Sequence, residues 1–266
     1  MTLHVETLGR GPALVLVHGW GVNSGVWQAL LPQLMSRYRV TCVDLPGHGE
    51  SRALPMPATL AALAAQVSAA VPAEAVWLGW SLGGLVSLRA ALDFPGRLRG
   101  LVLSNTTARF CSAPDWPHAM PPAQLTRFAD ELVHDFAGTM QRFLALQTLG
   151  DEHARTTLRV LRDSVAARGA PDAASLATGL ALLRDSDLRP DLPALRLPAR
   201  VLAGEYDRLT PPAAAQELAQ RIGGADCVTF ARCAHAPFIS HPAGFMQRLD
   251  EFMSVNRADP VTRHAG

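Results

Sequence analysis

The sequence predicts an α/β fold: an open, mostly parallel central sheet with helices on both faces and a helical insertion. Short apolar runs alternate along the chain with segments whose apolar residues recur at helical spacing. Runs that are apolar throughout suit strands covered on both faces, as in a parallel sheet. Of the 266 residues, 48% are hydrophobic and 18% are charged, which is typical of a globular protein and excludes a disordered chain or a coiled coil.

The expected elements follow one another in strand–helix order. Five apolar runs predict strands over residues 13–17, 40–43, 75–80, 98–103 and 199–203, and a sixth strand is expected near 227–230. Helical spacing predicts helices over residues 26–36, 60–70, 82–92 and 212–221, and a last helix around 245–253. This alternation implies right-handed crossover connections.

The alternation breaks between residues 112 and 190, where helical patterns continue without a convincing strand. Prolines stand at both ends of this segment, at positions 114, 117, 121, 122, 190 and 193. Because insertions on a rigid scaffold commonly carry specificity, we expect a cap over the site, with ordinary main-layer helices as the alternative. The chain therefore divides into a core of residues 1–111 and 191–256, a cap of residues 112–190, and a tail, 257–266, expected to be disordered.

Charge and cysteine content argue against several classes of protein. With 24 basic and 23 acidic residues, the net charge of +1 gives no global field to attract nucleic acid or an anionic membrane. Four cysteines are too few for a disulfide scaffold and lack zinc spacing, so no metal is expected. The first ten residues contain no signal-peptide apolar block, and the most apolar stretch, 58–72, is too short to span a bilayer. We therefore expect a monomeric cytoplasmic protein.

A candidate nucleophile stands between the third apolar run and the helix after it. Residues 79–83 match the pattern Gly-x-Ser-x-Gly, with Ser81 at the centre. A nucleophile elbow requires this position between a strand and a helix. Glycines on both sides of Ser81 suit the sharp turn, which leaves little room for a Cβ. A glycine-rich turn with a solvated serine is the alternative, and the setting disfavours it.

A serine hydroxyl is a weak nucleophile, so it needs a general base, which in turn needs an orienting acid. The expected order along the chain is serine, acid, histidine. Asp207 follows the run at 199–203 and is our choice of acid, with Glu205 as the alternative. His235 follows the run near 227–230 and is the candidate base. His241 is the alternative base, although its place before a proline suits a helix-capping role.

The tetrahedral intermediate of such a reaction needs two backbone N–H donors for its oxyanion. Leu82, at the start of the helix after Ser81, is expected to supply one. The other is expected from the turn at residues 18–21, from the N–H of Trp20, whose indole would then lie by the reacting carbonyl. The glycine-rich segment 44–51 lacks the spacing of a phosphate or dinucleotide loop, so we interpret it as structural. No cofactor is expected.

Together these motifs resemble the α/β-hydrolase fold and, more closely, the family of pimeloyl-[acyl-carrier protein] methyl ester esterases of biotin synthesis. Residues 77–85, 142–148 and 234–242 carry the closer resemblance. The resemblance implies a cofactor-free serine carboxylesterase with the triad Ser81, Asp207 and His235, which releases methanol from the methyl ester of pimeloyl-[acyl-carrier protein].

The resemblance also implies contacts with the substrate and with the carrier protein. The implied substrate contacts are Trp20, Ser81, Leu82, Phe143, Leu144, Ala145, Leu146, Gln147 and His235. Carrier docking falls on Arg142, Arg155 and Arg159, while Gly138 stands where relatives can carry a further basic residue, for which Arg162 is a possible substitute. Arg155, Arg159 and Arg162 share one helix face, which suits an acidic carrier, although the residues alone favour a solvated charged face.

Two other functions remain open from the sequence. A different Ser–His–Asp hydrolase of this fold, such as a broad short-chain carboxylesterase, a lactonase or a thioesterase, would share the same triad. A non-catalytic binding protein on the same scaffold is disfavoured because all three triad residues are present.

Overall fold

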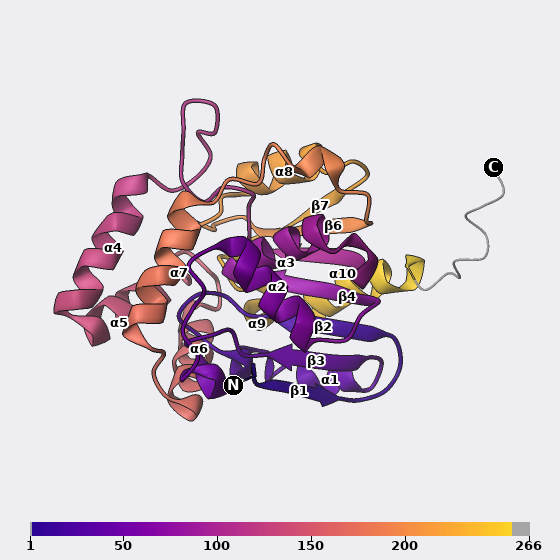
Figure 1. Cartoon of the computed structure of the whole chain (residues 1–266), viewed down its shortest axis with the longest axis horizontal. Coiled ribbons are helices and arrows are strands. Elements are labelled where there is room, and N and C mark those ends of the chain that lie inside the picture. The colour runs from indigo at the N-terminus through magenta and orange to yellow at the C-terminus, as the bar shows by residue number, and fades with distance from the viewer. Residues whose placement is uncertain (1, 257–266) are drawn as a thin grey trace.

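The centre of the molecule is a seven-stranded sheet with the spatial order β1-β3-β2-β4-β5-β6-β7. The computed structural model describes residues 2–256. Its strands are β1 (Val5–Leu8), β2 (Ala13–Val17), β3 (Arg39–Val43), β4 (Ala75–Trp80), β5 (Leu98–Ser104), β6 (Ala199–Gly204) and β7 (Asp226–Phe230). Only β1 runs antiparallel to its neighbour; the other five pairings are parallel, which confirms the predicted sheet (Figure 1).

Strand β1 is the one strand that the sequence did not predict. It has four residues, Val-Glu-Thr-Leu, all of which are at least partly exposed. It pairs with β3 at the edge of the sheet, with Val5 opposite Val43. An edge strand with one open side needs no continuous apolar run, so it lacks the signal that marks the buried strands.

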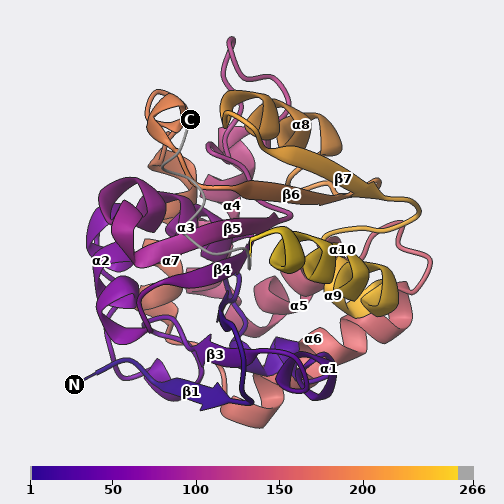
Figure 2. The same cartoon turned by 90° about the vertical axis from the view of Figure 1, so that its right-hand side faces the viewer.

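Helices cover both faces of the sheet (Figure 2). On one face lie α2 (Leu60–Ala70), α3 (Leu82–Asp93) and α8 (Pro212–Arg221); on the other lie α1 (Leu31–Met35), α9 (Pro237–Ser240) and α10 (Pro242–Val255). Alternate residues of each strand point to opposite faces. In β2, Val15 and Val17 join the first apolar cluster, whereas Leu14 and Leu16 join the second. Burial on both faces explains why the central strands β2 and β4 are apolar throughout.

The helix expected over residues 26–36 was predicted wrongly. The chain instead forms a short 3-10 helix, Ser24–Trp27, and begins α1 only at Leu31. Pro32 explains the break, because proline lacks an N–H and its ring clashes with the carbonyl four residues earlier. At its observed place in the first turn of α1, this proline is tolerated.

Four helices follow one another between β5 and β6: α4 (Pro122–His134), α5 (Phe136–Leu146), α6 (Ala154–Arg168) and α7 (Ala173–Asp185). Figure 1 shows them gathered at one side of the sheet. The cap boundaries at residues 112 and 190 stay a prediction, and the tail at 257–266 lies outside the described residues. Within residues 2–256, no helix combines the length and the apolar character that crossing a membrane requires.

Candidate active site

The candidate nucleophile, Ser81, stands at a strained turn between β4 and α3. Its φ of 55° lies in a region that L-residues rarely adopt. The turn is fixed because the N–H of Ser81 donates to the carbonyl of Ser104 (3.0 Å). A Cβ on Gly83 would clash with the carbonyl oxygen of Val17, and a Cβ on Gly79 would clash with the backbone of α3. Strain held by packing is typical of a nucleophile elbow.

Three other predicted site residues lie at the same edge of the sheet as Ser81. Trp20 follows β2, Asp207 follows β6 and His235 follows β7. Because the carboxyl ends of parallel strands meet at one edge, segments far apart in the sequence converge there. A Cβ on Gly19 would lie 3.2 Å from Cβ of Ser81, so the turn with Trp20 runs directly past the serine.

Asp207 and His235 form a hydrogen-bonded pair, with 2.7 Å between Oδ2 and Nδ1 and at most 1% of either side chain exposed. Burial alone would raise the pKa of Asp207, but the nearby imidazole and the hydrogen bonds to the carboxylate hold it below its usual value. The other donors are the Leu209 and Thr210 N–H groups, the Thr210 hydroxyl and the Asn105 amide. An ionised Asp207 places the imidazole proton on Nδ1 and leaves Nε2 as a base.

Nε2 of His235 is buried and has no hydrogen-bond partner among the described residues. The residue lies against the elbow, because the indole N–H of Trp80 donates to the His235 carbonyl (2.7 Å) and the two rings are 5.5 Å apart. A buried polar atom without a partner is costly and calls for an explanation. The absence of a partner is explained if Nε2 is a base left free to accept the proton of Ser81.

The two alternative residues lie elsewhere. Glu205 is exposed and accepts from the N–H of Arg232 (2.7 Å), without contacting His235. His241 bonds to the Ser240 hydroxyl (2.8 Å) and to the carboxylate of Glu152 (2.9 Å). The geometry therefore favours Asp207 as the acid and His235 as the base.

Hydrogen bonds of two buried histidines hold the turn that carries Trp20 in place. Nε2 of His48 accepts from the N–H of Gly21 (3.1 Å), and Nδ1 bonds to the Pro46 carbonyl (2.8 Å). His18 accepts from the N–H of Leu45 in the same manner (2.9 Å). Burial lowers the pKa of His48 to about 3 and also lowers that of His18, so both imidazoles are neutral acceptors. Segment 44–51 is structural, as interpreted, but it holds the candidate oxyanion turn.

The predicted substrate residues of the cap separate into two groups. The Phe143 ring packs edge-on against Trp20, with centroids 4.6 Å apart, and the Gln147 carbonyl accepts from the N–H of His235 (3.0 Å). Leu144 packs instead with the helices of the opposite cluster, Ala145 is exposed, and Leu146 lines a groove between α4 and α5. The structure thus brings Phe143 and Gln147 to the candidate site, whereas Leu144 and Ala145 lie elsewhere and Leu146 packs only at the margin of the cluster that contains Trp20 and Phe143.

Trp20 also joins the core to two cap helices. Its indole N–H donates to the Leu176 carbonyl in α7 (2.9 Å), while its ring meets Phe143 of α5. A Cβ on Gly179 of α7 would lie 2.8 Å from the same indole. These contacts could not be predicted from the sequence, because Leu176 and Gly179 lie in an ordinary helical pattern far from the glycine-rich turn.

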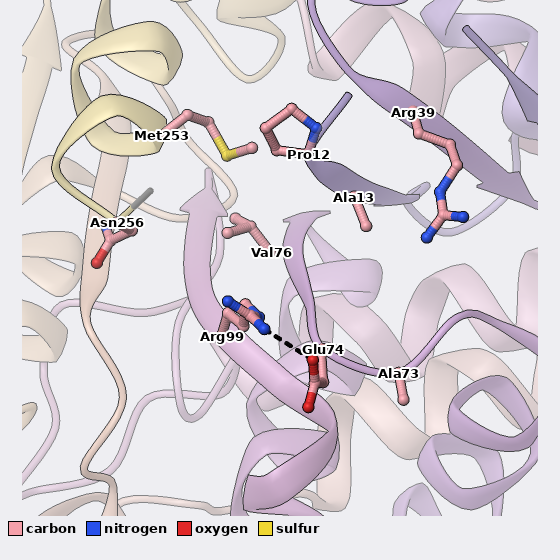
Figure 3. A pocket seen from close by; sticks show the side chains of 9 residues that line it. All are labelled: Pro12, Ala13, Arg39, Ala73, Glu74, Val76, Arg99, Met253 and Asn256. Carbon is pink, nitrogen blue, oxygen red and sulfur yellow. Dashed lines mark hydrogen bonds and ion pairs between the residues drawn. The ribbon is translucent and has the colours of Figure 1, made fainter. Parts of the chain in front are cut away.

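Figure 3 shows a pocket at the opposite edge of the sheet. Its volume is about 340 Å³, and it is lined by the beginnings of the central strands and the end of α10. The Arg99–Glu74 ion pair (2.7 Å) crosses it. Ligands of open α/β sheets bind at the carboxyl ends of the strands, so this pocket is separate from the candidate active site.

Among residues 2–256, one group of three side chains has the spacing to hold a metal ion. Asp151, Cys233 and His241 bring their donor atoms within 4.8 Å of one another. Burial raises the pKa of the Cys233 thiol to about 12, so the thiolate that zinc prefers is disfavoured. The Asp151 oxygens accept from backbone N–H groups, and both His241 nitrogens have partners. We assign these residues no metal.

Known proteins are similar to this chain in sequence. A family model described as the alpha/beta hydrolase fold matches residues 12–242. A pimeloyl-[acyl-carrier protein] methyl ester esterase from Stenotrophomonas maltophilia is 44% identical, over 95% of this chain and 97% of its own. One from Xanthomonas oryzae pv. oryzae is 44% identical, over 95% and 99%.

Solved structures share the fold at lower identity. An esterase from Exiguobacterium antarcticum has a TM-score of 0.84 at 21% identity and covers 96% of both chains. The enol-lactonase from Burkholderia xenovorans has a TM-score of 0.82 at 26% identity, over 95% of this chain and 96% of its own. Enzymes with different substrates therefore share this architecture, and the substrate must be argued from the site and the closer relatives.

The buried neutral imidazoles predict how stability depends on pH. Below about pH 6.5 the unfolded chain binds protons that folded His48 and His18 do not, so the free energy of unfolding falls as pH falls. Each histidine contributes a slope of about 1.4 kcal/mol per pH unit until its folded pKa is reached. His48→Phe should remove one such slope. Urea unfolding between about pH 4.5 and 7 measures it, with exposed His118→Phe as the control. An unchanged slope in His48→Phe would contradict the account.

Proposed function

We infer that this chain is a carboxylic ester hydrolase, because it belongs to the α/β-hydrolase family and, within it, to the pimeloyl-[acyl-carrier protein] methyl ester esterases. Its substrate is the methyl ester of pimeloyl-[acyl-carrier protein], and its products are methanol and pimeloyl-[acyl-carrier protein]. The observation that carries the chemistry is the strained Ser81 elbow beside a buried His235–Asp207 pair whose Nε2 is unpartnered among the described residues.

In the first half of the reaction, Ser81 Oγ attacks the ester carbonyl carbon while Nε2 of His235 takes its proton. The ionised Asp207 stabilises the imidazolium and keeps its orientation. The N–H groups of Leu82 and Trp20 donate to the oxyanion, each contributing about 3 kcal/mol to transition-state stabilisation. The imidazolium then gives its proton to the departing methoxide, which leaves as methanol.

In the second half, the acyl group is an ester of Ser81. His235 takes a proton from water, and the resulting hydroxide attacks the acyl carbonyl. Collapse of the second tetrahedral intermediate breaks the bond to Ser81 and returns the proton to Oγ. The freed carboxylate remains on the carrier-borne acyl chain, and none of these steps calls for a cofactor.

The apolar middle of the acyl chain is held between the core and the cap. Trp20 and Phe143 supply the aromatic surface, and Met140 extends it, because a Cβ on Gly21 would lie 2.9 Å from the Met140 methyl. Aromatic and thioether side chains bury large apolar areas. The side-chain nitrogen of Gln147 is buried without a partner among the described residues, so it is available to a polar group of the substrate.

Carrier docking falls on the exposed arginines of α6. None of the described residues forms an ion pair with Arg155, Arg159 or Arg162. Arg142 differs, because its guanidinium already pairs with Glu131 (3.0 Å) and Asp135 (3.1 Å). Unpaired guanidinium groups on one helix face attract an acidic partner more strongly than neutralised ones. We therefore assign docking mainly to Arg155 and Arg159, with Arg162 one turn further along α6.

Gly138 leaves room for the side chain that caps the start of α5. Its N–H donates to the carboxylate of Asp135, which caps the start of α5 (2.9 Å). A Cβ there would clash with that carboxylate. The chain thus lacks one basic group near Arg142, which further shifts the docking face toward α6.

A cytoplasmic location and a monomeric state stay predictions.

The triad generates the first prediction of this proposal. Ser81→Ala should abolish hydrolysis of both methyl pimeloyl-carrier protein and p-nitrophenyl esters with little effect on melting temperature. Asp207→Asn should lower kcat by about 10⁴, because His235 loses the acid that fixes its tautomer. Glu205→Gln is the matched control and should retain activity. Mass spectrometry of the carrier-bound product and absorbance of nitrophenolate measure the two reactions. Loss of activity in Glu205→Gln with a harmless Asp207→Asn would refute the acid assignment.

The docking face generates the second prediction. Reversing both Arg155 and Arg159 to Glu should raise KM for the carrier-linked ester by about tenfold or more, since two favourable charge contacts become repulsive. Hydrolysis of p-nitrophenyl esters should be unchanged. Wild-type kcat/KM for the carrier substrate should fall with added salt, because salt screens exposed charges. Arg142→Ala, the control, should have a smaller effect.

Steady-state assays of both substrates at low and high salt decide between the alternatives. Equal losses on the two substrates would mean that Arg155 and Arg159 support the cap structure. No loss on either would leave them as a solvated face and would overturn carrier docking on α6.

A further inference from the structure

The loop between α5 and α6, residues 147–153, is joined directly to the loop that carries His235. The N–H of His235 donates to the Gln147 carbonyl (3.0 Å), and the N–H of Glu152 donates to the Arg232 carbonyl (3.0 Å). Between these two bonds, the carboxylate of Asp151 accepts from the N–H of Ala234 (2.9 Å). The loop 147–153 is therefore bonded to the loop of the proposed base at His235 itself and at two positions before it, Ala234 and Arg232.

Asp151 is a buried carboxylate, 7% exposed, and no described cation forms an ion pair with it. A buried charge without a counter-ion is costly unless hydrogen bonds compensate for the lost water. Oδ1 accepts from the N–H of His153 (2.7 Å), while Oδ2 accepts from that of Ala234. Bonds to an ionised acceptor are about twice as strong as neutral ones. The bond to Ala234 is therefore a strong constraint on the backbone beside His235.

The peptide groups of Ala234 and His235 are held at all four polar atoms. The Ala234 carbonyl accepts from the Asn105 amide (3.2 Å), and the His235 carbonyl accepts from the Trp80 indole (2.7 Å). Those two donors belong to the core. Asp151 is the residue of the cap whose side chain bonds to this backbone. It lies 83 residues from Ala234 in the sequence.

We propose that Asp151 is a positioning residue for His235, which fixes the backbone so that Nε2 stays aligned with Ser81. The proposal rests on the proposed catalytic role of His235. A displacement of about 1 Å at a reacting group can cost about 100-fold in rate. The cap then contributes to kcat as well as to substrate binding, because the loop that follows Phe143 and precedes Arg155 also fixes the base.

The test compares three variants on a small p-nitrophenyl ester, which does not depend on carrier docking. Asp151→Ser keeps a hydroxyl that can accept from the nearby N–H of His153 but is too short to reach Ala234. It should lower kcat about 10- to 100-fold and leave KM within about twofold. Asp151→Asn keeps one acceptor oxygen long enough to reach Ala234 but loses the acceptor for the second N–H, so it should recover part of the loss. Glu152→Gln, the control, disturbs the contacts of the same loop to Arg232 and His241 and should retain wild-type kcat.

The rate at which a fluorophosphonate labels Ser81 gives a second readout, because labelling needs the same deprotonation by His235. This rate should fall in Asp151→Ser by the same factor as kcat and recover in part in Asp151→Asn. Wild-type kcat in Asp151→Ser, a change in KM alone, or equal losses in Asp151→Ser and Glu152→Gln would each overturn the positioning role. Failure of the proposed function itself is seen separately, as unimpaired hydrolysis by Ser81→Ala.

Discussion

The hydrogen bond between the buried carboxylate of Asp207 and Nδ1 of His235 is the interaction on which the site depends. Removing a carboxylate from water is costly, and four further hydrogen bonds from Asn105, Leu209 and Thr210 compensate for it here. The ionised carboxylate fixes the tautomer of the imidazole, which leaves Nε2 free to act as the proposed base. The remaining features hold this pair beside Ser81, the proposed nucleophile.

Close packing between loops maintains the position of this pair relative to Ser81. The elbow stays strained because Gly83 allows α3 to approach the end of β2, and the candidate oxyanion turn is held by hydrogen bonds of two buried neutral histidines. Trp20 packs against Phe143 of α5 and donates a hydrogen bond to α7. Asp151, in the loop after α5, accepts from the backbone N–H next to His235. Residues of the core and of the helices between β5 and β6 together hold the proposed reacting groups, so variation in these helices can alter the substrate while the proposed chemistry is kept.

Much of this arrangement could be predicted from the sequence because its signals are local. Strand β4, which Ser81 follows, is buried and apolar throughout, and Asp207 and His235 also follow strands that have an apolar run. Strand β1 is too short and too exposed to give that signal, and the predicted helix over residues 26–36 is wrong before Pro32, although the cause of that break is local. The contacts of His48 with Gly21 and of Asp151 with Ala234 join residues 27 and 83 positions apart. No local pattern marks such contacts, so only the fold identifies them.

The central claim is that Ser81 is the residue to which the acyl group is transferred. The most direct measurement is rapid acid quenching of the protein during turnover of methyl pimeloyl-carrier protein, followed by peptide mass spectrometry. The account predicts a substrate-derived acyl ester on the peptide that contains Ser81, absent from the Ser81→Ala variant. An acyl group on any other residue, or full turnover by Ser81→Ala, would contradict it.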